Sequence, residues 1–346
     1  MTADDIRGMA RACGFELAGV ARADPVDDRE AYRDWARAGY AGEMRYLTDR
    51  RAEVRDDPRR LLPSVRSVIC IGRLYNTPWP YSTEWQPEEC GWISRYAWGG
   101  DYHDEMRSGL ERLEARLREK VAVAFESKIC VDTAPLLERS YARLAGLGWI
   151  GKNTCLINQQ SGSWFFLGEL LVSLEIEPDA PPPDRCGSCT RCINACPTAA
   201  IVPFGDRYAV DSRLCISYFT IELRGAVPEP LRGSMGAHVF GCDICQDVCP
   251  WNRRADVTVN PFYAPAHHGP TLEKLAGISE AEFREMFRCT PVTRARYSGF
   301  LRNVAIAMGN AGTPRFRAPL ERLAASDDAV VAEHARWGLE RLGVVV

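Results

Sequence analysis

The 346-residue sequence lacks several features that would assign it to a specialised class. Its best apolar stretch, residues 164–174, is interrupted by Glu169 and falls short of the roughly 18 residues that a membrane helix needs. The first residues are acidic and have no apolar segment of the secretory type. A composition with 46% hydrophobic and 26% charged residues is ordinary for a globular chain. We therefore expect a cytoplasmic protein that contacts no membrane. We also expect a monomer, although the sequence says little about oligomeric state.

Cysteine, in contrast, is abundant. The chain has 14 cysteines, and eight of them lie within residues 186–249. These eight are Cys186, Cys189, Cys192, Cys196, Cys215, Cys242, Cys245 and Cys249. The first four form C-x2-C-x2-C-x3-C-P, the run found in bacterial ferredoxins, whose fourth cysteine binds the other of two clusters. A shorter run ends in Cys249-Pro250, and Cys215 between the runs can supply its missing ligand.

This crossing pattern predicts two four-thiolate sets for two [4Fe-4S] clusters. Cluster one takes Cys186, Cys189, Cys192 and Cys249, and cluster two takes Cys196, Cys215, Cys242 and Cys245. A pair of zinc sites is the alternative, because zinc also accepts C-x2-C pairs, although zinc does not require the full run and its shortened copy. Two iron–sulfur cubes indicate low-potential electron transfer. Most of the chain lies outside this segment, so we expect the electrons to reach a group held by the same chain.

The remaining sequence predicts three parts. Helical and strand patterns alternate over roughly residues 1–175, which favours an α/β domain. We expect helices over 3–13, 27–39, 104–123 and 136–145, and strands over 15–22, 65–72, 125–132 and 163–175. A proline-rich stretch follows at 177–185, and 283–342 has a helical pattern suggesting one or two HEAT-like helix pairs. The expected domains are thus 1–176 (α/β), 177–260 (ferredoxin-like, two-cluster) and 261–346 (α-helical, HEAT-like).

One glycine motif is similar to a nucleotide-binding loop. Gly146, Gly148 and Gly151 match G-x-G-x-x-G, and Lys152 nearly completes a phosphate-binding loop. Both motifs require a strand before the glycines, whereas a helix is predicted there, and Asn153 occupies the place of the magnesium-binding Ser or Thr. We therefore expect a helix end followed by a turn, with glycine supplying a positive φ.

Several segments together resemble the epoxyqueuosine reductases, a cobalamin-dependent iron–sulfur family related to reductive dehalogenases. The segments are RYAWGGDYH (95–103), VDTAPLLE (131–138), AGLGWIGKN (145–153), CISYFTIE (215–222) and GCDICQDVCPW (241–251). The resemblance implies reduction of the epoxide of epoxyqueuosine to queuosine at the wobble position of a tRNA with a GUN anticodon. It also implies cobalamin held between the α/β and cluster domains, two [4Fe-4S] clusters that feed it electrons, and an external low-potential electron donor.

Asp132 is the position that matches the proton donor of the family. An opening epoxide leaves an alkoxide that an acid must protonate, and a carboxyl can serve near neutral pH if burial raises its pKa. The alternative is that Asp132 only caps the helix that follows. The resemblance also implies that corrin contacts come from Arg55, Ser94, Tyr96, Asp132, Leu156, Leu167, Ser217 and Gly241, for which ordinary packing is the alternative. His103 belongs to the same motif as Tyr96, and a structural role is the simpler interpretation for it.

The net charge of −3 does not indicate nucleic-acid binding. A local excess of positive charge does indicate it. Residues 286–320 contain six arginines and no acid. With support from Arg224 nearby, the predicted tRNA contacts are Arg224, Arg294, Arg296 and Arg302. A solvated helix face is the alternative.

Two other functions compete with the family assignment. One is a corrinoid reductase or reductive dehalogenase of a small molecule, against which the basic segment counts. The other is an iron–sulfur electron carrier without catalysis of its own, against which the large N-terminal part and Asp132 count. The sequence leaves the roles of Cys13, Cys70, Cys90, Cys130, Cys155 and Cys289 open.

Overall fold

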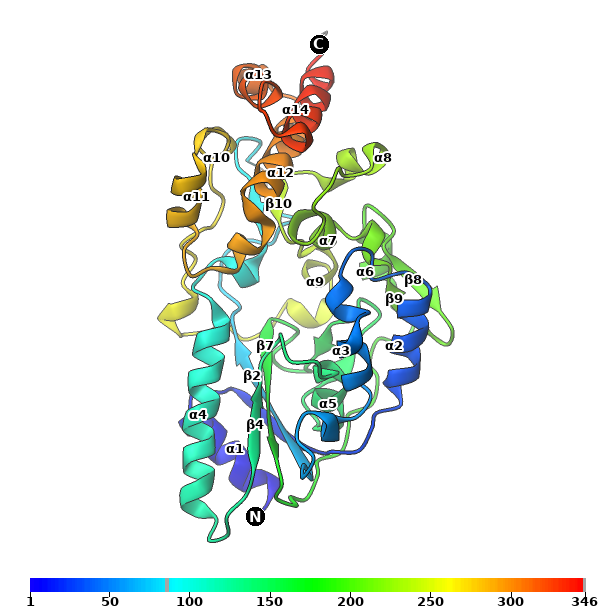
Figure 1. Cartoon of the computed structure of the whole chain (residues 1–346), viewed down its shortest axis with the longest axis vertical. Coiled ribbons are helices and arrows are strands. Elements are labelled where there is room, and N and C mark those ends of the chain that lie inside the picture. Colours follow the sequence, from blue (N-terminus) through cyan, green and yellow to red (C-terminus); the bar gives the residue numbers. More distant parts are fainter. Residues whose placement is uncertain (85–86, 345–346) are drawn as a thin grey trace.

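The structure is a computed structural model that describes residues 1–84 and 87–344. The molecule is elongated, with a β-sheet and its helices at the end that holds the N-terminus and a group of helices at the C-terminal end (Figure 1). The cysteine-rich segment lies between these two ends. Within the described ranges, the helices include none that is both long and apolar enough to cross a membrane.

The main sheet has four strands in the order β1-β2-β7-β4. They are β1 (Leu17–Arg22), β2 (Ser67–Leu74), β7 (Phe165–Val172) and β4 (Ser127–Cys130). Each strand runs antiparallel to its neighbours. All four predicted strands are therefore confirmed, and the alternation of helices and strands along the chain does not build the parallel sheet that often accompanies it.

Helices cover both faces of this sheet. α1 (Ala3–Ala12) and α4 (Tyr102–Lys120) pack on one face, and α5 (Glu138–Leu144) packs on the other (Figure 1). The leucines Leu110, Leu113 and Leu117 of α4 recur at helical spacing and are fully buried. This anchoring fixes the position of the helix, so that its N-terminal end lies where β4 gives way to the following loop. The two remaining helices of this part are α2 (Asp28–Arg37) and α3 (Arg50–Val54).

Short elements make up the cysteine-rich segment. They are α6 (Arg191–Ala195), the hairpin β8 (Ile201–Phe204) and β9 (Arg207–Val210), α7 (Ile216–Ile221), α8 (Glu229–Arg232), β10 (His238–Phe240) and α9 (Ile244–Asp247). Strands β3 (Trp92–Ile93), β5 (Trp149–Ile150) and β6 (Leu156–Ile157) lie earlier in the chain. The glycine motif follows helix α5, and Gly146 has a φ of +80°, so the expected helix end and turn are confirmed.

The 3-10 helices are short. They are η1 (Arg45–Leu47), η2 (Pro58–Arg60), η3 (Arg95–Ala97), η4 (Ser212–Leu214), η5 (Gly233–Met235), η6 (Pro250–Asn252), η7 (Pro261–Tyr263), η8 (Pro291–Ala295) and η9 (Pro314–Phe316).

The C-terminal part is helical, as expected. Its helices are α10 (Leu272–Gly277), α11 (Glu280–Met286), α12 (Arg296–Ala311), α13 (Arg317–Ala324) and α14 (Ala329–Arg341). Their core also contains Trp92, Trp98 and Phe240, and β3 pairs in parallel with β10. Residues from all three predicted domains thus share one core. The three-part division and the HEAT-like helix pairs stay predictions.

Arg302 has a different role from the one that the sequence suggests. Its side chain is fully buried in α12, and its guanidinium donates to the carbonyl oxygens of Phe219, Leu223 and Gly225. The Leu223 and Gly225 bonds measure 2.9 and 2.7 Å. Arg302 therefore ties the C-terminal helices to the end of α7. A buried guanidinium bound to backbone carbonyls cannot contact tRNA, so its predicted role in tRNA binding is wrong.

We predict that Arg302→Ala destabilises the protein, because it leaves buried carbonyls without donors at about 1–3 kcal/mol each. The midpoint of chemical denaturation should fall by the equivalent of about 3 kcal/mol or more. The matched control is Arg322→Ala, because Arg322 is exposed, and such a change typically alters stability by less than about 0.5 kcal/mol. Equal midpoints for the two variants would contradict this role.

Candidate active site

Asp132 lies in the loop between β4 and α5. Its backbone has a φ of +46°, which is unusual for a residue other than glycine, and its side chain is 35% exposed. The N-cap position of α5 is Leu137, so Asp132 does not cap this helix and the capping interpretation is wrong. Strained backbone of this kind persists where the surrounding structure holds it, and such residues cluster at functional sites.

Two carboxylates face the ring of His103 from opposite sides. The Nε2 atom lies 3.2 Å from Oδ2 of Asp132, and the Nδ1 atom lies 2.6 Å from Oδ1 of Asp101. Asp101 is also the N-cap of α4, where its carboxylate accepts the backbone N–H of His103. Because α4 is anchored on the sheet, this cap fixes the ring of His103 against Asp132.

Arg294 reaches the same site from η8 in the C-terminal part. Its Nε lies 2.8 Å from Oε1 of Glu222, its Nη2 donates to the hydroxyl of Tyr46 at 3.0 Å, and its Nη1 lies 3.9 Å from Oδ2 of Asp132. The sequence suggests a tRNA phosphate as the partner of Arg294. In the structure the guanidinium is instead ion-paired with Glu222 and directed at Asp132.

These cations decide the charge of Asp132. Burial raises the pKa of its carboxyl, but the hydrogen bond from His103 and the charges of His103 and Arg294 outweigh burial and lower the pKa below its usual value. The hydrogen bonds to Asp101 and Asp132 raise the pKa of His103 to about 9 against the opposing effect of burial. Near neutral pH an imidazolium therefore faces a carboxylate. The expectation that burial would raise the pKa of Asp132 is wrong in this structure.

One buried and one partly buried carboxyl group nearby are absent from the site residues predicted from the sequence. Glu169 in β7 is 1% exposed, pairs in register with Cys70 and Cys130, and has a pKa raised well above its usual value by burial and then by Glu138. Burial and the charge of Asp132 raise the pKa of Glu138 to about 7. The sequence does carry a signal for Glu169, because this residue interrupts the apolar stretch 164–174.

Several positions predicted to contact a corrin surround Asp132 and the cysteines. Arg55 is buried, donates to the backbone oxygen of Tyr46 at 3.2 Å, and its charge acts on Glu138. Burial raises the pKa of Tyr96, whose hydroxyl also faces the charges of Arg294 and Asp132. These contacts bring Arg55 and Tyr96 to the Asp132 side of the site.

The other predicted positions lie beside the cysteines or in the sheet core. Gly241 has a φ of +68°, and a Cβ there would lie 2.4 Å from the Cβ of Ser94, so this close approach requires glycine. Gly241 precedes Cys242, and Ser217 hydrogen-bonds to Cys215. Leu156 is buried in the core under α5, against which Leu167 packs.

Charge effects link several cysteines of each predicted set. Burial, and then the charge of Cys186, raises the pKa of both Cys192 and Cys249, with Cys189 acting on Cys192. Burial, and then the charge of Cys215, raises the pKa of Cys242, on which Cys196 also acts. These neighbours are the ones that the crossing pattern predicts, and the ligand sets themselves stay a prediction.

The segment after the glycine motif braces the cysteine loops. The Nζ atom of Lys152 donates to the carbonyl oxygens of Gly187 and Cys189 at 2.7 and 2.9 Å, and the side chain of Asn153 donates to the carbonyl of Cys245 at 3.2 Å. Cys155, whose role the sequence leaves open, hydrogen-bonds to the thiol of Cys245. Lys152, which occupies the place of the lysine in a phosphate-binding loop motif, thus binds the backbone of the loop at residues 187–189.

Most of the predicted basic segment is neutralised in the structure. Arg315 pairs with Glu89 and Glu273, Arg317 pairs with Glu321, and Arg288 pairs with Glu285. The six arginines therefore do not form one basic surface, because Glu285 and Glu321 at the two edges of the segment and the distant Glu89 and Glu273 pair with three of them.

Arg224 and Arg296 remain accessible to an anionic ligand. Both side chains are exposed, and neither forms an ion pair within residues 1–84 and 87–344. Burial, and then the charges of Arg296 and Arg294, lowers the pKa of Arg224, which shows that the three guanidinium groups are neighbours. The basic surface is thus smaller than predicted and lies next to Asp132.

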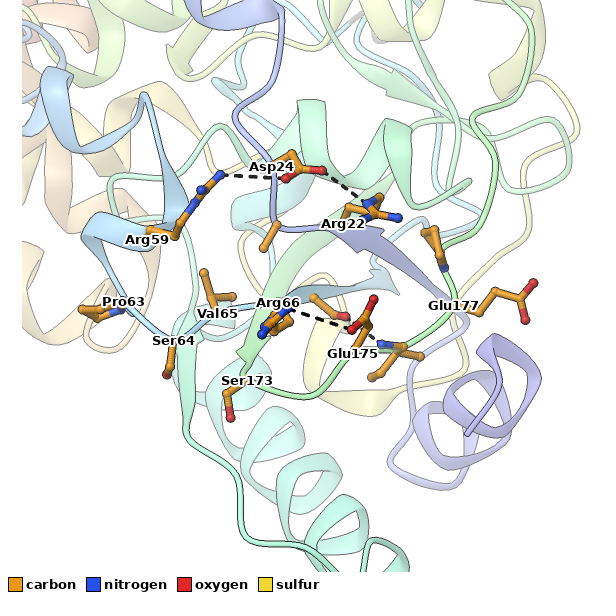
Figure 2. A pocket seen from close by; sticks show the side chains of 14 residues that line it. Arg22, Asp24, Arg59, Pro63, Ser64, Val65, Arg66, Ser173, Glu175 and Glu177 are labelled. Carbon is orange, nitrogen blue, oxygen red and sulfur yellow. Dashed lines mark hydrogen bonds and ion pairs between the residues drawn. The ribbon is translucent and has the colours of Figure 1, made fainter.

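A cavity of about 810 Å³ lies elsewhere (Figure 2). It is lined by residues at the ends of β1, β2 and β7, including Arg22, Ser67 and Ser173. Ser127, at the start of β4, pairs with Val172 near this cavity. Cys130 ends β4 at the opposite end of the sheet, and Asp132 lies two residues beyond it. Figure 2 shows its arginines engaged with Asp24 and Glu175. This cavity is separate from the site at Asp132.

Comparisons with known proteins identify the family. One family model, described as a 4Fe-4S double cluster binding domain, matches residues 185–252, and another, described as epoxyqueuosine reductase QueG, matches residues 55–133. An epoxyqueuosine reductase of Xanthomonas campestris is 39% identical over 345 residues, which cover 98% of this chain and 96% of that protein. The chain belongs to the epoxyqueuosine reductase family. The Escherichia coli member is 36% identical, with 97% of this chain and 88% of that protein covered.

Solved structures of this family have the same fold. A crystal structure of epoxyqueuosine reductase with a tRNA-Tyr epoxyqueuosine-modified stem loop superimposes with a TM-score of 0.89 at 30% identity, covering 98% of this chain and 90% of that one. A Bacillus subtilis structure, described as having its catalytic aspartate loop swung out of the active site, gives a TM-score of 0.87 at 29% identity, with the same shares of the two chains covered. The chain is accordingly an oxidoreductase with a double [4Fe-4S] cluster domain, so the zinc alternative is set aside.

We predict that Cys215→Ala removes one cluster and spares the other. Anaerobically reconstituted parent should contain about eight iron atoms per chain and the variant about four, because each cube holds four. The matched control is Cys90→Ala, a partly exposed cysteine outside both sets, which should keep the parental iron content. Two intact cubes in the Cys215 variant would contradict its assignment as a ligand.

Proposed function

We propose that this protein reduces epoxyqueuosine at the wobble position of a tRNA with a GUN anticodon to queuosine. The observation that supports it most is the placement of Asp132 between two cations, His103 and Arg294, in a chain of this family. The reaction converts an epoxide to an alkene and water, and it consumes two electrons and two protons. The electrons come from an external low-potential donor through the two [4Fe-4S] clusters.

Cobalamin is the cofactor that we propose for the reducing step. The residues that would hold it are Arg55, Ser94, Tyr96, Leu156, Leu167, Ser217 and Gly241. Their chemistry fits a large ring with an amide rim, because they combine apolar side chains, a buried guanidinium and a glycine whose backbone makes a close approach. When bound, reduced cobalamin supplies a strong one-electron donor or nucleophile, and the protein supplies position and protons.

The residues around Asp132 provide the acid and the charge that the reaction needs. We propose that the carboxyl of Asp132 delivers a proton to the oxygen of the opening epoxide. Arg294, 3.9 Å from Asp132 Oδ2, places a positive charge where negative charge develops on that oxygen. The loop position of Asp132 agrees with the description of the Bacillus subtilis relative, which places a catalytic aspartate on a loop.

The neighbouring exposed arginines suit an anticodon stem-loop. Arg224 and Arg296 would bind phosphates beside the site and set the register of the stem. The wobble nucleotide must leave its stack to reach Asp132, as in other enzymes that modify a base. We propose that the C-terminal HEAT-like helices, as the third of three domains, support this contact.

We predict that Asp132→Asn abolishes most activity, because the amide cannot supply an acidic proton. Reduction of epoxyqueuosine-containing tRNA should fall by roughly 10²- to 10⁴-fold, while tRNA affinity and iron content stay near parental values. Asp206→Asn changes an exposed carboxylate on the β8–β9 turn and serves as the control. A near-parental rate in the Asp132 variant would leave water or a substrate hydroxyl as the acid.

We predict that the double change Arg224→Ala and Arg296→Ala weakens binding of the tRNA stem-loop. The slope of log affinity against log salt should become shallower by about one unit for each phosphate that the variant no longer binds. Arg116→Ala, an exposed arginine in the distant half of α4, is the control (Figure 1). An unchanged slope in the double variant would show that the stem binds elsewhere.

A further inference from the structure

The hydrogen bonds around His103 require a charged ring. A neutral imidazole donates from one nitrogen and accepts at the other, but both nitrogens of His103 face carboxylate oxygens, which can only accept. Only the imidazolium donates to Asp101 and to Asp132 at once. The geometry therefore places one transferable proton on Nε2, 3.2 Å from Asp132 Oδ2.

Asp132 itself holds no proton in this arrangement. Its carboxylate accepts from His103 and faces Arg294, and both cations favour its ionised form. An acid that is ionised at rest must be loaded before it can protonate a substrate. In the proposed reaction Asp132 must be protonated twice, because an epoxide that becomes an alkene and water takes up two protons.

We infer that His103 is the source of these protons and acts through Asp132. The Nε2 proton of His103 moves to Oδ2 of Asp132, and the carboxyl so formed passes that same proton to the oxygen of the opening epoxide. The N–H bond breaks, an O–H bond forms on the substrate oxygen, and His103 is left neutral with its remaining proton on Nδ1, held by Asp101. The electrons come from the proposed reducing system, so this inference rests on the proposed function.

His103 can regain a proton from solvent after each transfer. The side chain of His103 is 32% exposed, so its ring can take a proton from water after each transfer. Asp101 favours this uptake because its carboxylate stabilises the imidazolium from the Nδ1 side. The same path can then supply the second proton, which leaves with the oxygen as water.

The other groups that face Asp132 are poorer proton sources. They are Tyr102, Tyr46, Tyr96, Arg294, Glu138 and Glu169. The three phenols have raised pKa values, that of Tyr46 to about 12, and an arginine does not release its proton in this range. Glu169 is buried in the sheet. Glu138, with a pKa raised to about 7, is the one competitor among the described groups and supplies the matched control.

The test measures single-turnover reduction of the modified stem-loop from pH 6 to pH 10 with the cofactor-loaded enzyme. The parent rate should fall as pH rises through about 9, because the protonated ring is the loaded form. In His103→Gln the rate at pH 8 should drop about 10²-fold, and the fall should move to acidic pH, where Asp132 must carry its own proton. In Asp101→Asn, which keeps a side chain able to cap α4, the fall should move below pH 9.

A second readout does not depend on turnover. NMR titration of the imidazole signals in the cluster-loaded enzyme without tRNA should show one histidine with a midpoint near 9. That signal should disappear in His103→Gln and shift to lower pH in Asp132→Asn.

Glu138→Gln should leave the alkaline fall of the rate in place. If His103→Gln keeps the parental rate and profile while Asp132→Asn is inactive, the inference is overturned and the proposed function stands. If the fall moves with Glu138→Gln instead, Glu138 is the source. A parent enzyme that does not reduce the modified stem-loop would refute the proposed function itself.

Discussion

The ion pair between His103 and Asp132 is the contact on which the arrangement of the site depends. Its two residues come from different elements, α4 and the loop after β4, and neither would be fixed by its own segment alone. The buried leucines of α4 hold that helix on the sheet, and the cap by Asp101 then fixes the ring of His103. The positive φ of Asp132 brings its carboxylate to this ring. The packing of one helix thus determines the charge of the proposed acid.

A second contact extends the site into the C-terminal part. Arg294 bridges Glu222 and Asp132, while Arg302, eight residues later, is buried against the backbone at the end of α7. The two arginines have the same charge and lie in the same segment, yet one shapes the site and the other supports the fold. Their difference comes from burial and partners, because a fully desolvated guanidinium must be satisfied by fixed acceptors. The C-terminal part therefore contributes a residue to the proposed active site in addition to its proposed support of the tRNA.

The sequence predicted the local features well. Hydrophobic periodicity located every strand of the main sheet, and the spacing of the cysteines predicted a double-cluster segment, which the family model over residues 185–252 confirms. The motif resemblance selected Asp132. These features depend on residues close in the chain, or on motifs whose chemistry constrains spacing.

The predictions that failed have one physical cause in common. The pKa of Asp132 depends on His103 and Arg294, which reach it through tertiary packing. The charges of Arg294 and Arg315 in the basic segment are paired with Glu222, Glu89 and Glu273, which lie far from the segment in the chain. Local charge counts cannot include partners that only the fold brings near. Glu169 is a similar case. In the sequence it only interrupts an apolar stretch, and the fold shows that it is buried in β7.

The charges of the proposed site link tRNA binding to the protonation of His103. Negative charge near a titratable group raises its pKa, so tRNA phosphates held at Arg224 and Arg296 would act on His103 in the same direction as Asp101 does. The acid would then be loaded most completely when the substrate is bound. Arg294 opposes this effect at Asp132 and keeps the carboxyl acidic enough to release its proton. Proton transfer from His103, whose pKa is raised, to Asp132, whose pKa is lowered, is uphill by itself, and the oxyanion that develops on the opening epoxide is the acceptor that completes it.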